Sequence, residues 1–163
     1  MIINPYSYPA AGGSPTLIHA INAGAGAADG YESDTGYIVL GDPYTDGSAI
    51  DTSLLTDVPS QAVLQSYRYK NSGTAVDYLV SGLNNTPHTV RVFLWSDGGV
   101  GTQDITINSV LVADNLDVAT EAGSTYKAIQ RDYAVTPSAN TISLQIAAAS
   151  GYCLIGAFEV FED

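Results

Sequence analysis

The chain has 163 residues, of which 45% are apolar and only 13% charged, and this balance excludes an intrinsically disordered protein. A chain of this length suits one domain that builds its hydrophobic core without disulfides or metal ions. Five Lys and Arg stand against 17 Asp and Glu, which gives a formal net charge of −12 at pH 7. Such a surface repels nucleic-acid phosphates and anionic membranes, so neither is an expected partner.

The acidic residues are concentrated early in the chain and have two interpretations. From Asp29 to Asp57 every charged side chain is acidic, and Arg68 is the first basic residue. These acids keep the protein soluble, or some of them bind Ca²⁺, which takes about six to eight oxygen ligands. No Asp-x-Asp-x-Asp loop is present. We therefore expect no metal ion or other cofactor, with Ca²⁺ as the alternative.

Residues 1–16 are rich in proline, which fixes φ and removes amide donors. We expect an extended N-terminal arm, which is either a frayed tail or a segment that docks through Tyr6 and Tyr8 on a neighbouring subunit or a second copy of the chain. The beginning also lacks the basic start and continuous apolar run of a secretory signal. No stretch approaches the roughly 18 apolar residues of a membrane span, so we expect a protein that folds in a cytoplasm.

Short segments of alternating polarity fill residues 17–163 and predict one domain of β-strands. Val90, Val92 and Leu94 fall on one side of an extended chain and Arg91 on the other, because side chains alternate along a strand. The 3.6-residue period of an amphipathic helix is not sustained anywhere. Strands are predicted at residues 16–22, 37–40, 62–69, 75–80, 89–95, 104–108, 110–112, 126–135, 141–147 and 154–161.

Turn residues such as Asn108-Ser109 separate these strands, and such short spacing is typical of a sandwich or barrel. We favour an all-β, antiparallel β-sandwich of the jelly-roll kind, because Ile142 and Leu144 alternate with Ser143 and leave one face solvated. The long segment 29–60 carries apolar residues that favour an ordered, packed excursion. These are Leu40, Ile50, Leu54, Leu55 and Val58.

Catalytic motifs are not found in the sequence, and we expect no enzyme. Glycoside hydrolysis needs two carboxylates at a set separation, and no carboxylate here has a recognisable catalytic context. The two histidines, His19 and His88, belong to no recognisable motif, and there is no nucleophile elbow. Cys153 lies in an apolar run and is expected to be a small buried hydrophobe.

Several segments stand in a distinctive order along the chain. They are Ile21–Gly24, Leu64–Tyr69, Thr89–Trp95, Asp104–Asn108, Arg131–Val135 and Gly156–Val160. This order resembles that of the malectin-like carbohydrate-binding domains over residues 17–161. The resemblance implies a β-sandwich whose end loops bind sugars through aromatic residues. A sugar ring can pack its C–H face on Tyr or Trp, while its hydroxyls bond to amides and carboxylates.

Only some of the family's sugar-binding residues have a counterpart in this sequence. Leu64 stands where the family has a sugar-stacking tyrosine, loop 96–101 lacks its aromatic pair, and loop 147–152 lacks its aspartate. The candidate carbohydrate-binding residues are Tyr31, Tyr37, Tyr44, Trp95, Asp97 and Tyr152. The alternative for Trp95 is a cap on the core, and the alternative for the loop tyrosines is packing of their own loop.

Four further side chains are expected to be structural. Tyr67 and Tyr69 share a strand face and are expected to pack across strands. Arg68 and Arg131 are expected to pair with acids of segment 29–60.

Two functions remain open, and both place the protein on a virion that assembles in the host cytoplasm. The first is a non-catalytic carbohydrate-binding module that touches glycans for host attachment. The second is a structural accessory protein that decorates the virion through its arm, binds neighbouring subunits and has no sugar site. The virion setting is suggested because residues 2–6 resemble the starts of some tailed-phage virion proteins, which lysis releases without a secretion signal.

Overall fold

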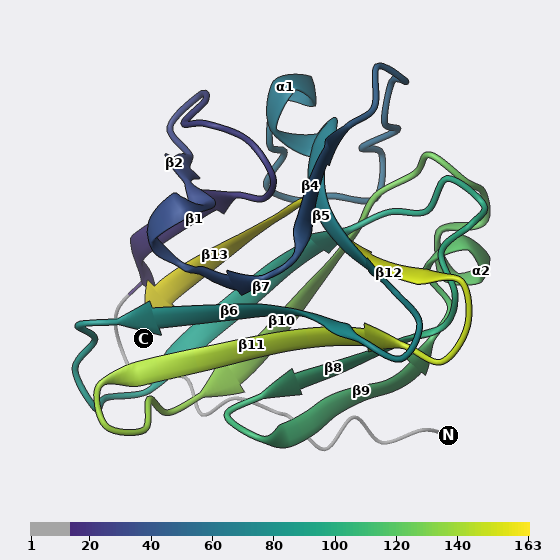
Figure 1. Cartoon of the computed structure of the whole chain (residues 1–163). Coiled ribbons are helices and arrows are strands. Elements are labelled where there is room, and N and C mark those ends of the chain that lie inside the picture. Colours follow the sequence, from purple (N-terminus) through teal and green to yellow (C-terminus); the bar gives the residue numbers. More distant parts are fainter. Residues whose placement is uncertain (1–13) are drawn as a thin grey trace, which may run out of the picture.

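The alternating segments form three β-sheets in the computed structural model, which describes residues 14–163 (Figure 1). The expected arm, residues 1–16, lies almost wholly outside the described residues. The docking role of Tyr6 and Tyr8 therefore stays a prediction, as does the boundary between the arm and the domain.

Two five-stranded sheets form the sandwich. The first has the order β10-β7-β13-β1-β2. Its strands are β1 (Thr16–Asn22), β2 (Glu32–Ser33), β7 (His88–Leu94), β10 (Ile129–Val135) and β13 (Ala157–Glu162). The second has the order β3-β6-β11-β8-β9. Its strands are β3 (Ile38–Leu40), β6 (Ala75–Ser81), β8 (Gln103–Ile107), β9 (Val110–Leu116) and β11 (Thr141–Ala148). The pairs are antiparallel except β1 with β2, so the predicted all-β antiparallel sandwich is confirmed.

A third sheet of three strands, in the order β12-β5-β4, is the part of the fold that matters for function. Its strands are β4 (Asp42–Thr45), β5 (Ser66–Asn71) and β12 (Tyr152–Ile155). The helices are short: the 3₁₀ turn η1 (Asp34–Gly36), α1 (Gln61–Leu64) and α2 (Val118–Ala122). No helix among residues 14–163 has the length and apolar character needed to cross a membrane.

The main core lies between the two large sheets. Val90, Val92 and Leu94 of β7 are fully buried there, and they share this core with Ile142 and Leu144 of β11. The alternation predicted for both strands is thus confirmed, because period-two spacing directs every second side chain into the sandwich.

A second core lies on the opposite face of β7. Phe93 and Trp95 are fully buried there against Leu64, Ile50 and Leu154, which come from α1, the segment before it and β12. The face of β7 that turns away from the sandwich is therefore covered at one end by segment 46–65 and β12. Cys153, beside Leu154 on β12, is buried in the main core, as predicted from its apolar surroundings.

Two predicted strands are broken in the structure. Residues 62–69 do not form one strand, because Ser60 caps α1 and its side chain accepts a hydrogen bond from Val63 N, so that β5 begins only at Ser66. Residues 154–161 are divided at Gly156, where the chain passes from the small sheet to the first large sheet. The amide of Gly156 donates to the carbonyl of Phe93 at 3.0 Å and fixes this crossing.

Segment 29–60 is ordered and packed, but only some of its apolar residues provide the packing. Ile50 is buried in the second core, and Leu55 packs against it. Leu40, Leu54 and Val58 are 41%, 48% and 58% exposed, which corrects the expectation that they hold the segment down. The segment lies over the surface of the sheets, so only the residues on its inner side meet a core.

Candidate functional site: a pocket lined by tyrosines

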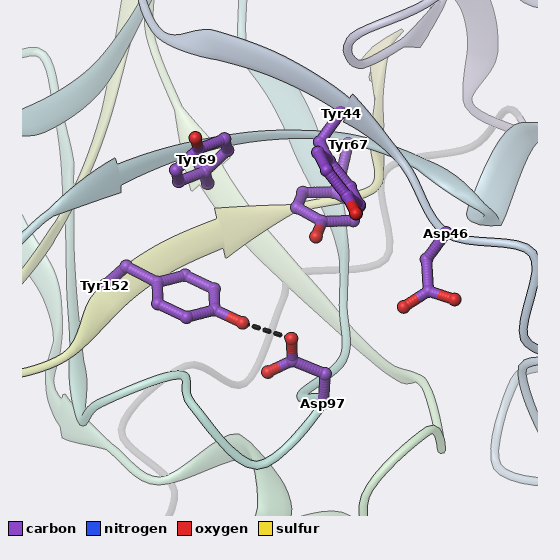
Figure 2. Close-up of a pocket in the computed structure, with 6 residues that line it drawn as sticks. All are labelled: Tyr44, Asp46, Tyr67, Tyr69, Asp97 and Tyr152. Atoms are coloured by element: carbon purple, nitrogen blue, oxygen red, sulfur yellow. Dashed lines mark hydrogen bonds between the residues drawn. The ribbon is translucent and has the colours of Figure 1, made fainter.

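A pocket of about 270 Å³ opens where the small sheet meets the loop after β7. Four tyrosines and two aspartates line it: Tyr44, Asp46, Tyr67, Tyr69, Asp97 and Tyr152 (Figure 2). They come from β4 and the residue after it, from β5, from loop 96–101 and from the start of β12. Figure 2 shows the rings of Tyr44, Tyr67 and Tyr152 and the Asp97 carboxylate around a common space.

Strand pairing gathers the tyrosines. Tyr44 lies directly opposite Tyr67 in the antiparallel pair of β4 with β5, and Tyr69 lies two residues further along the same face. The ring centroids of Tyr44 and Tyr67 are 5.3 Å apart, and those of Tyr67 and Tyr69 are 6.1 Å apart. Tyr152 of the neighbouring strand β12 stands edge-on to Tyr69 at 5.9 Å. The result is a wall of tilted rings.

Trp95 supports this wall from below and does not line the pocket. Its indole is fully buried, meets the ring of Tyr67 edge-to-face at 5.1 Å, and donates from Nε1 to the carbonyl of Leu64 at 2.9 Å. The expectation of an exposed, sugar-facing Trp95 is therefore wrong. The alternative role, a cap on a core, is the one that the structure supports, because α1 and the segment before it cover this end of β7.

Hydrogen bonds hold the two aspartates of the pocket. The Tyr152 hydroxyl donates to Asp97 Oδ2, and the amide of Gly99 donates to Asp97 Oδ1 at 2.8 Å. Asp46 Oδ1 accepts from the amide of Ser48 at 2.8 Å, and this bond lowers the pKa of the Asp46 carboxyl below its usual value. Burial, reinforced at Tyr152 by Asp97, raises the pKa of the phenols of Tyr67 and Tyr152 far above 10. At neutral pH, Asp46 is therefore charged and both phenols are neutral.

A glycine contact fixes the loop that carries Asp97. Gly101 N donates to the carbonyl of Tyr152 at 3.0 Å, and a Cβ at Gly101 would lie only 1.9 Å from the carbonyl oxygen of Ser150. Glycine alone allows this close approach of two backbones. Loop 96–101 is thus held against the turn before β12, which places Asp97 beside Tyr152.

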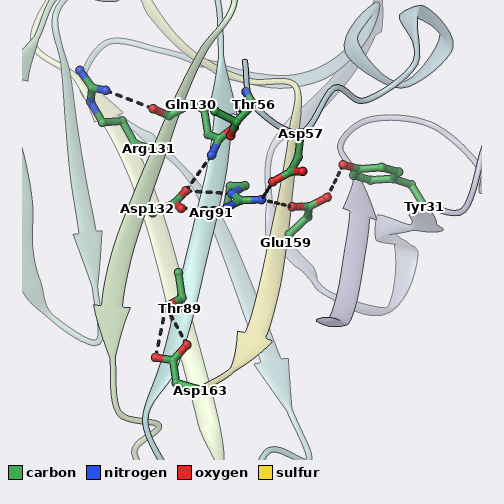
Figure 3. A network of polar contacts seen from close by, with 10 residues as sticks. All are labelled: Tyr31, Thr56, Asp57, Thr89, Arg91, Gln130, Arg131, Asp132, Glu159 and Asp163. Carbon is green, nitrogen blue, oxygen red and sulfur yellow. Dashed lines mark hydrogen bonds and ion pairs between the residues drawn. The ribbon is translucent and has the colours of Figure 1, made fainter. Parts of the chain in front are cut away.

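Two predicted binding residues lie elsewhere. The Tyr31 hydroxyl donates to Glu159 Oε1 at 2.5 Å (Figure 3), and the Tyr37 hydroxyl donates to Glu32 Oε2 at 2.6 Å. Burial, together with this bond to Glu32, raises the pKa of Tyr37 to about 12. Both tyrosines are half-buried and pack their own segment, which was the alternative expected for them. Of the predicted set, the pocket brings together Tyr44, Asp97 and Tyr152.

Sequence reasoning missed Asp46, Tyr67 and Tyr69 as pocket residues. The predicted cross-strand packing of Tyr67 and Tyr69 is confirmed by their ring contacts with Tyr44 and Tyr152, but the same rings also face the pocket. The available signal was the Tyr-x-Tyr spacing, which puts two rings on one face. Its partner strand, β4, contains Pro43 and was not predicted, so nothing in the sequence aligned Tyr44 with Tyr67.

The arginines are structural. Arg68 forms a bidentate pair with buried Asp34, at 2.7 and 3.0 Å, which confirms the predicted partner in segment 29–60. Arg131 instead pairs with Glu121 of α2, which corrects the prediction for that residue, because β10 runs beside α2.

Arg91 joins three parts of the chain on the outer face of the first sheet (Figure 3). It binds both oxygens of Asp132 at 2.9 Å, contacts Asp57, and lies 3.5 Å from Glu159. The Arg91 network, defined by these four residues, fastens segment 51–60 to the sheet. Within residues 14–163, no three or more His, Cys, Asp or Glu side chains are grouped so that they could hold a metal ion.

Comparison with known proteins identifies the architecture. No family model and no curated protein sequence matches the chain. Among solved structures, the ANX2 ectodomain from Arabidopsis thaliana matches with a TM-score of 0.78 and 16% identity over 90% of this chain and 49% of that one. FER, in its complex with the plant peptide RALF23 and LLG2, matches with a TM-score of 0.73 and 16% identity over 90% of this chain and 48% of that one. The fold is malectin-like.

One of the solved structures that match this chain is an enzyme. Bacteroides uniformis β-glucuronidase 2 matches with a TM-score of 0.72 and 17% identity over 89% of this chain but only 18% of that one. The chain spans about half the length of the receptor chains that it matches. At these identities the likeness shows the fold alone, since one fold hosts many functions.

Proposed function

We propose that this malectin-like domain is a non-catalytic carbohydrate-binding module and that its ligand lies in the pocket lined by tyrosines. The observation that carries the proposal is the convergence of three segments beside β5 at one pocket. They are residues 42–46, loop 96–101 and the start of β12. The family resemblance implies a sugar site in the first long segment, in the loop after strand 89–95 and in the last loop, and these regions supply Tyr44, Asp97 and Tyr152.

The chemistry of the pocket suits a saccharide. Tyr44 is 54% exposed and offers an open ring on which a pyranose can pack its C–H face. The carboxylates of Asp46 and Asp97 accept hydrogen bonds from sugar hydroxyls, and the phenol hydroxyls act as donors or acceptors. The individual residues differ from those that the resemblance implies, since Trp95 supports the site from beneath and Tyr67 and Tyr69 form part of its wall.

Binding without hydrolysis is the role that these carboxylates support. A glycosidase needs one carboxyl with a raised pKa as general acid and a second one at a set distance from it. The pKa of Asp46 is lowered, which makes it a poor proton donor at neutral pH. Asp97 is engaged by Tyr152 and by its own loop.

The proposal is tested by a glycan array followed by calorimetric titration of the best ligand. We expect Tyr44→Ala to weaken binding about tenfold or more, which corresponds to about 1.4 kcal/mol. Val110→Ala is a matched control, because Val110 is also exposed but lies on β9, outside the pocket. Thermal unfolding establishes that both variants fold. The absence of any ligand across a broad array, or unchanged affinity in Tyr44→Ala, overturns the proposal.

The virion setting and the docking arm stay proposals that rest on the sequence alone. Their support is the resemblance of residues 2–6 to the starts of some tailed-phage virion proteins. Detection of the chain in purified particles by mass spectrometry tests the setting. A variant that lacks residues 1–16 tests the arm, because normal incorporation of that variant contradicts a docking role.

A further inference from the structure

The charged side chains that line the pocket are all negative. Two carboxylates line it, and none of the five Lys and Arg of the chain does so. All five cations are within ion-pair distance of carboxylates outside the pocket. These pairs are Arg68–Asp34, Lys70–Asp42, Arg91–Asp132, Lys127–Asp51 and Arg131–Glu121. No cation of the described chain therefore neutralises Asp46 or Asp97 at short range.

The remaining lining consists of neutral aromatic rings. The phenols of Tyr67 and Tyr152 stay protonated at neutral pH, and Tyr69 and Tyr44 complete the wall. The rings of Tyr44 and Tyr69 are perpendicular, with centroids 6.4 Å apart, so the wall presents both faces and edges to the pocket. The negative face of an aromatic ring attracts a cation within about 6 Å, and an aromatic cage beside a carboxylate is a known arrangement for alkylammonium groups.

We propose that this pocket recognises a protonated amine and that its saccharide, given the proposed function, is an amino sugar with an unacetylated amino group. The ammonium lies against the tyrosine faces and between the carboxylates of Asp46 and Asp97. The sugar ring packs on Tyr44. A neutral sugar uses the same rings and hydroxyl acceptors but gains nothing from the two negative charges. An acidic sugar is repelled by them.

The buried surroundings of the pocket strengthen this preference. Tyr67 is only 5% exposed and rests on the fully buried Trp95, so little water contacts this part of the pocket wall. Attraction between opposite charges grows as water is excluded, and cation–π contacts are stronger when they are desolvated. The inference deepens the proposed function, since it names the class of sugar that the same pocket takes.

The experiment compares two disaccharides that differ only in acetylation. The whole chain is titrated calorimetrically with β-1,4-linked glucosamine disaccharide and with its N,N′-diacetyl form, at pH 6 and at pH 9. At pH 6 we expect the free amine to bind at least about tenfold more tightly, a difference of about 1.4 kcal/mol. At pH 9 this preference falls, because the amine loses its proton. Tetramethylammonium, compared with the uncharged neopentyl alcohol (2,2-dimethylpropan-1-ol), which has a similar tetrahedral shape, tests the cation contribution without a sugar ring.

Isosteric variants assign the effect to the pocket. Asp97→Asn keeps the acceptor for Tyr152 but removes one charge, and we expect it to reduce the amine preference at least threefold. Asp114→Asn on β9 is the matched control, because it removes an equal charge from an exposed site outside the pocket and leaves the preference unchanged.

The outcomes separate the two proposals. Equal or tighter binding of the acetylated disaccharide overturns the inference and leaves the proposed function standing. Binding of tetramethylammonium without binding of any saccharide overturns both, since the pocket is then a cation site for another ligand. An amine preference that is the same in Asp97→Asn as in the unchanged chain overturns the assignment to this pocket.

Discussion

At the scale of single residues, burial decides which aromatic side chain can meet a ligand. Trp95 and Tyr44 are both large aromatic residues close to the pocket, but the first is fully buried and the second is 54% exposed. The indole of Trp95 has one hydrogen-bond donor, and this donor is already engaged with the backbone carbonyl of Leu64. Trp95 therefore contributes to stability, and Tyr44 is available for binding.

We predict that Trp95→Phe destabilises the protein. The smaller ring leaves the carbonyl of Leu64 without its donor and removes atoms beneath Tyr67. An unpaired buried acceptor costs about 1–3 kcal/mol, and the lost packing adds to this. Urea denaturation followed by fluorescence of tyrosine or by circular dichroism measures the change. Tyr133→Phe, which replaces a partly buried aromatic residue distant from the pocket, is the control and should cost less.

We predict that Glu159 makes the stability of the protein depend on pH. Burial raises the pKa of its carboxyl above the usual value, although Tyr31 and Arg91 oppose this effect. A carboxyl whose pKa is raised in the folded state contributes stability below the unfolded-state pKa of about 4.3, and this contribution is lost as the pH rises through the folded-state pKa. Glu159→Gln does not titrate. Its free energy of unfolding should therefore rise relative to that of the unchanged protein between pH 4 and pH 8.

The control for this pH effect lies on the same strand. Hydrogen bonds from Asn84 and Thr86 lower the pKa of Glu162, so its contribution to stability is present at neutral pH and is lost as the pH falls. Glu162→Gln should therefore shift in the opposite direction over the same pH range. Urea denaturation at each pH gives both differences, and parallel shifts in the two variants contradict the assigned pKa directions.

At the scale of elements, turns and crossings fix where strands begin and end. Asn108 and Ser109 both have positive φ, 49° and 65°, which is the conformation of the tight hairpin turn between β8 and β9. The tight turn predicted at these residues is confirmed. Asn tolerates this conformation well, whereas Ser does so at a cost that glycine avoids.

We predict that Ser109→Gly stabilises the hairpin. Asn-Gly is the preferred pair for a turn with two positive φ values, so relief of strain should exceed the greater flexibility of glycine in the unfolded chain. The expected gain is up to about 1 kcal/mol, seen as a higher midpoint in thermal unfolding. Thr106→Gly, at a position within β8 where φ is negative, should instead lower the midpoint.

We predict that Gly101 is required to hold loop 96–101 in place beside the pocket. A methyl group there meets the Ser150 carbonyl at 1.9 Å, so loop 96–101 must move away from β12. We expect Gly101→Ala to destabilise the protein by about 1–3 kcal/mol and to weaken ligand binding, because Asp97 leaves its place beside Tyr152. Gly26→Ala is the control, since a Cβ at Gly26 meets nothing within 4 Å. Equal effects of both substitutions contradict this role of Gly101.

At the scale of the whole molecule, a net charge of −12 opposes folding through self-repulsion. We predict that the melting temperature rises by a few degrees between 10 mM and 500 mM NaCl, because salt shortens the screening length from about 30 Å to a few ångströms. Exposed ion pairs lose strength in salt, but each contributes only about 0–1 kcal/mol. Differential scanning calorimetry measures the shift. The shift should shrink at pH 4, and a melting temperature that falls with salt contradicts the prediction.

Much of the architecture could be predicted from local patterns. The alternation in segments 89–95 and 141–147 assigned the core faces of β7 and β11, and Asn108-Ser109 marked a tight turn. These signals are local because side-chain direction alternates along any extended chain and turn conformations depend on adjacent residues. Local sequence patterns were therefore sufficient to predict the all-β class, the inward-facing residues of the sandwich and the burial of Cys153.

The set of residues that meet at the pocket depends on long-range contacts of the folded chain. Tyr44 reaches Tyr67 through the pairing of β4 with β5, and Asp97 reaches Tyr152 through the close approach of Gly101 to Ser150. Both contacts join residues far apart in the sequence, and the pattern within either segment does not specify its partner. Trp95 shows the same dependence, because the residues that bury it come from α1 and β12, whose positions are set by the folded chain as a whole.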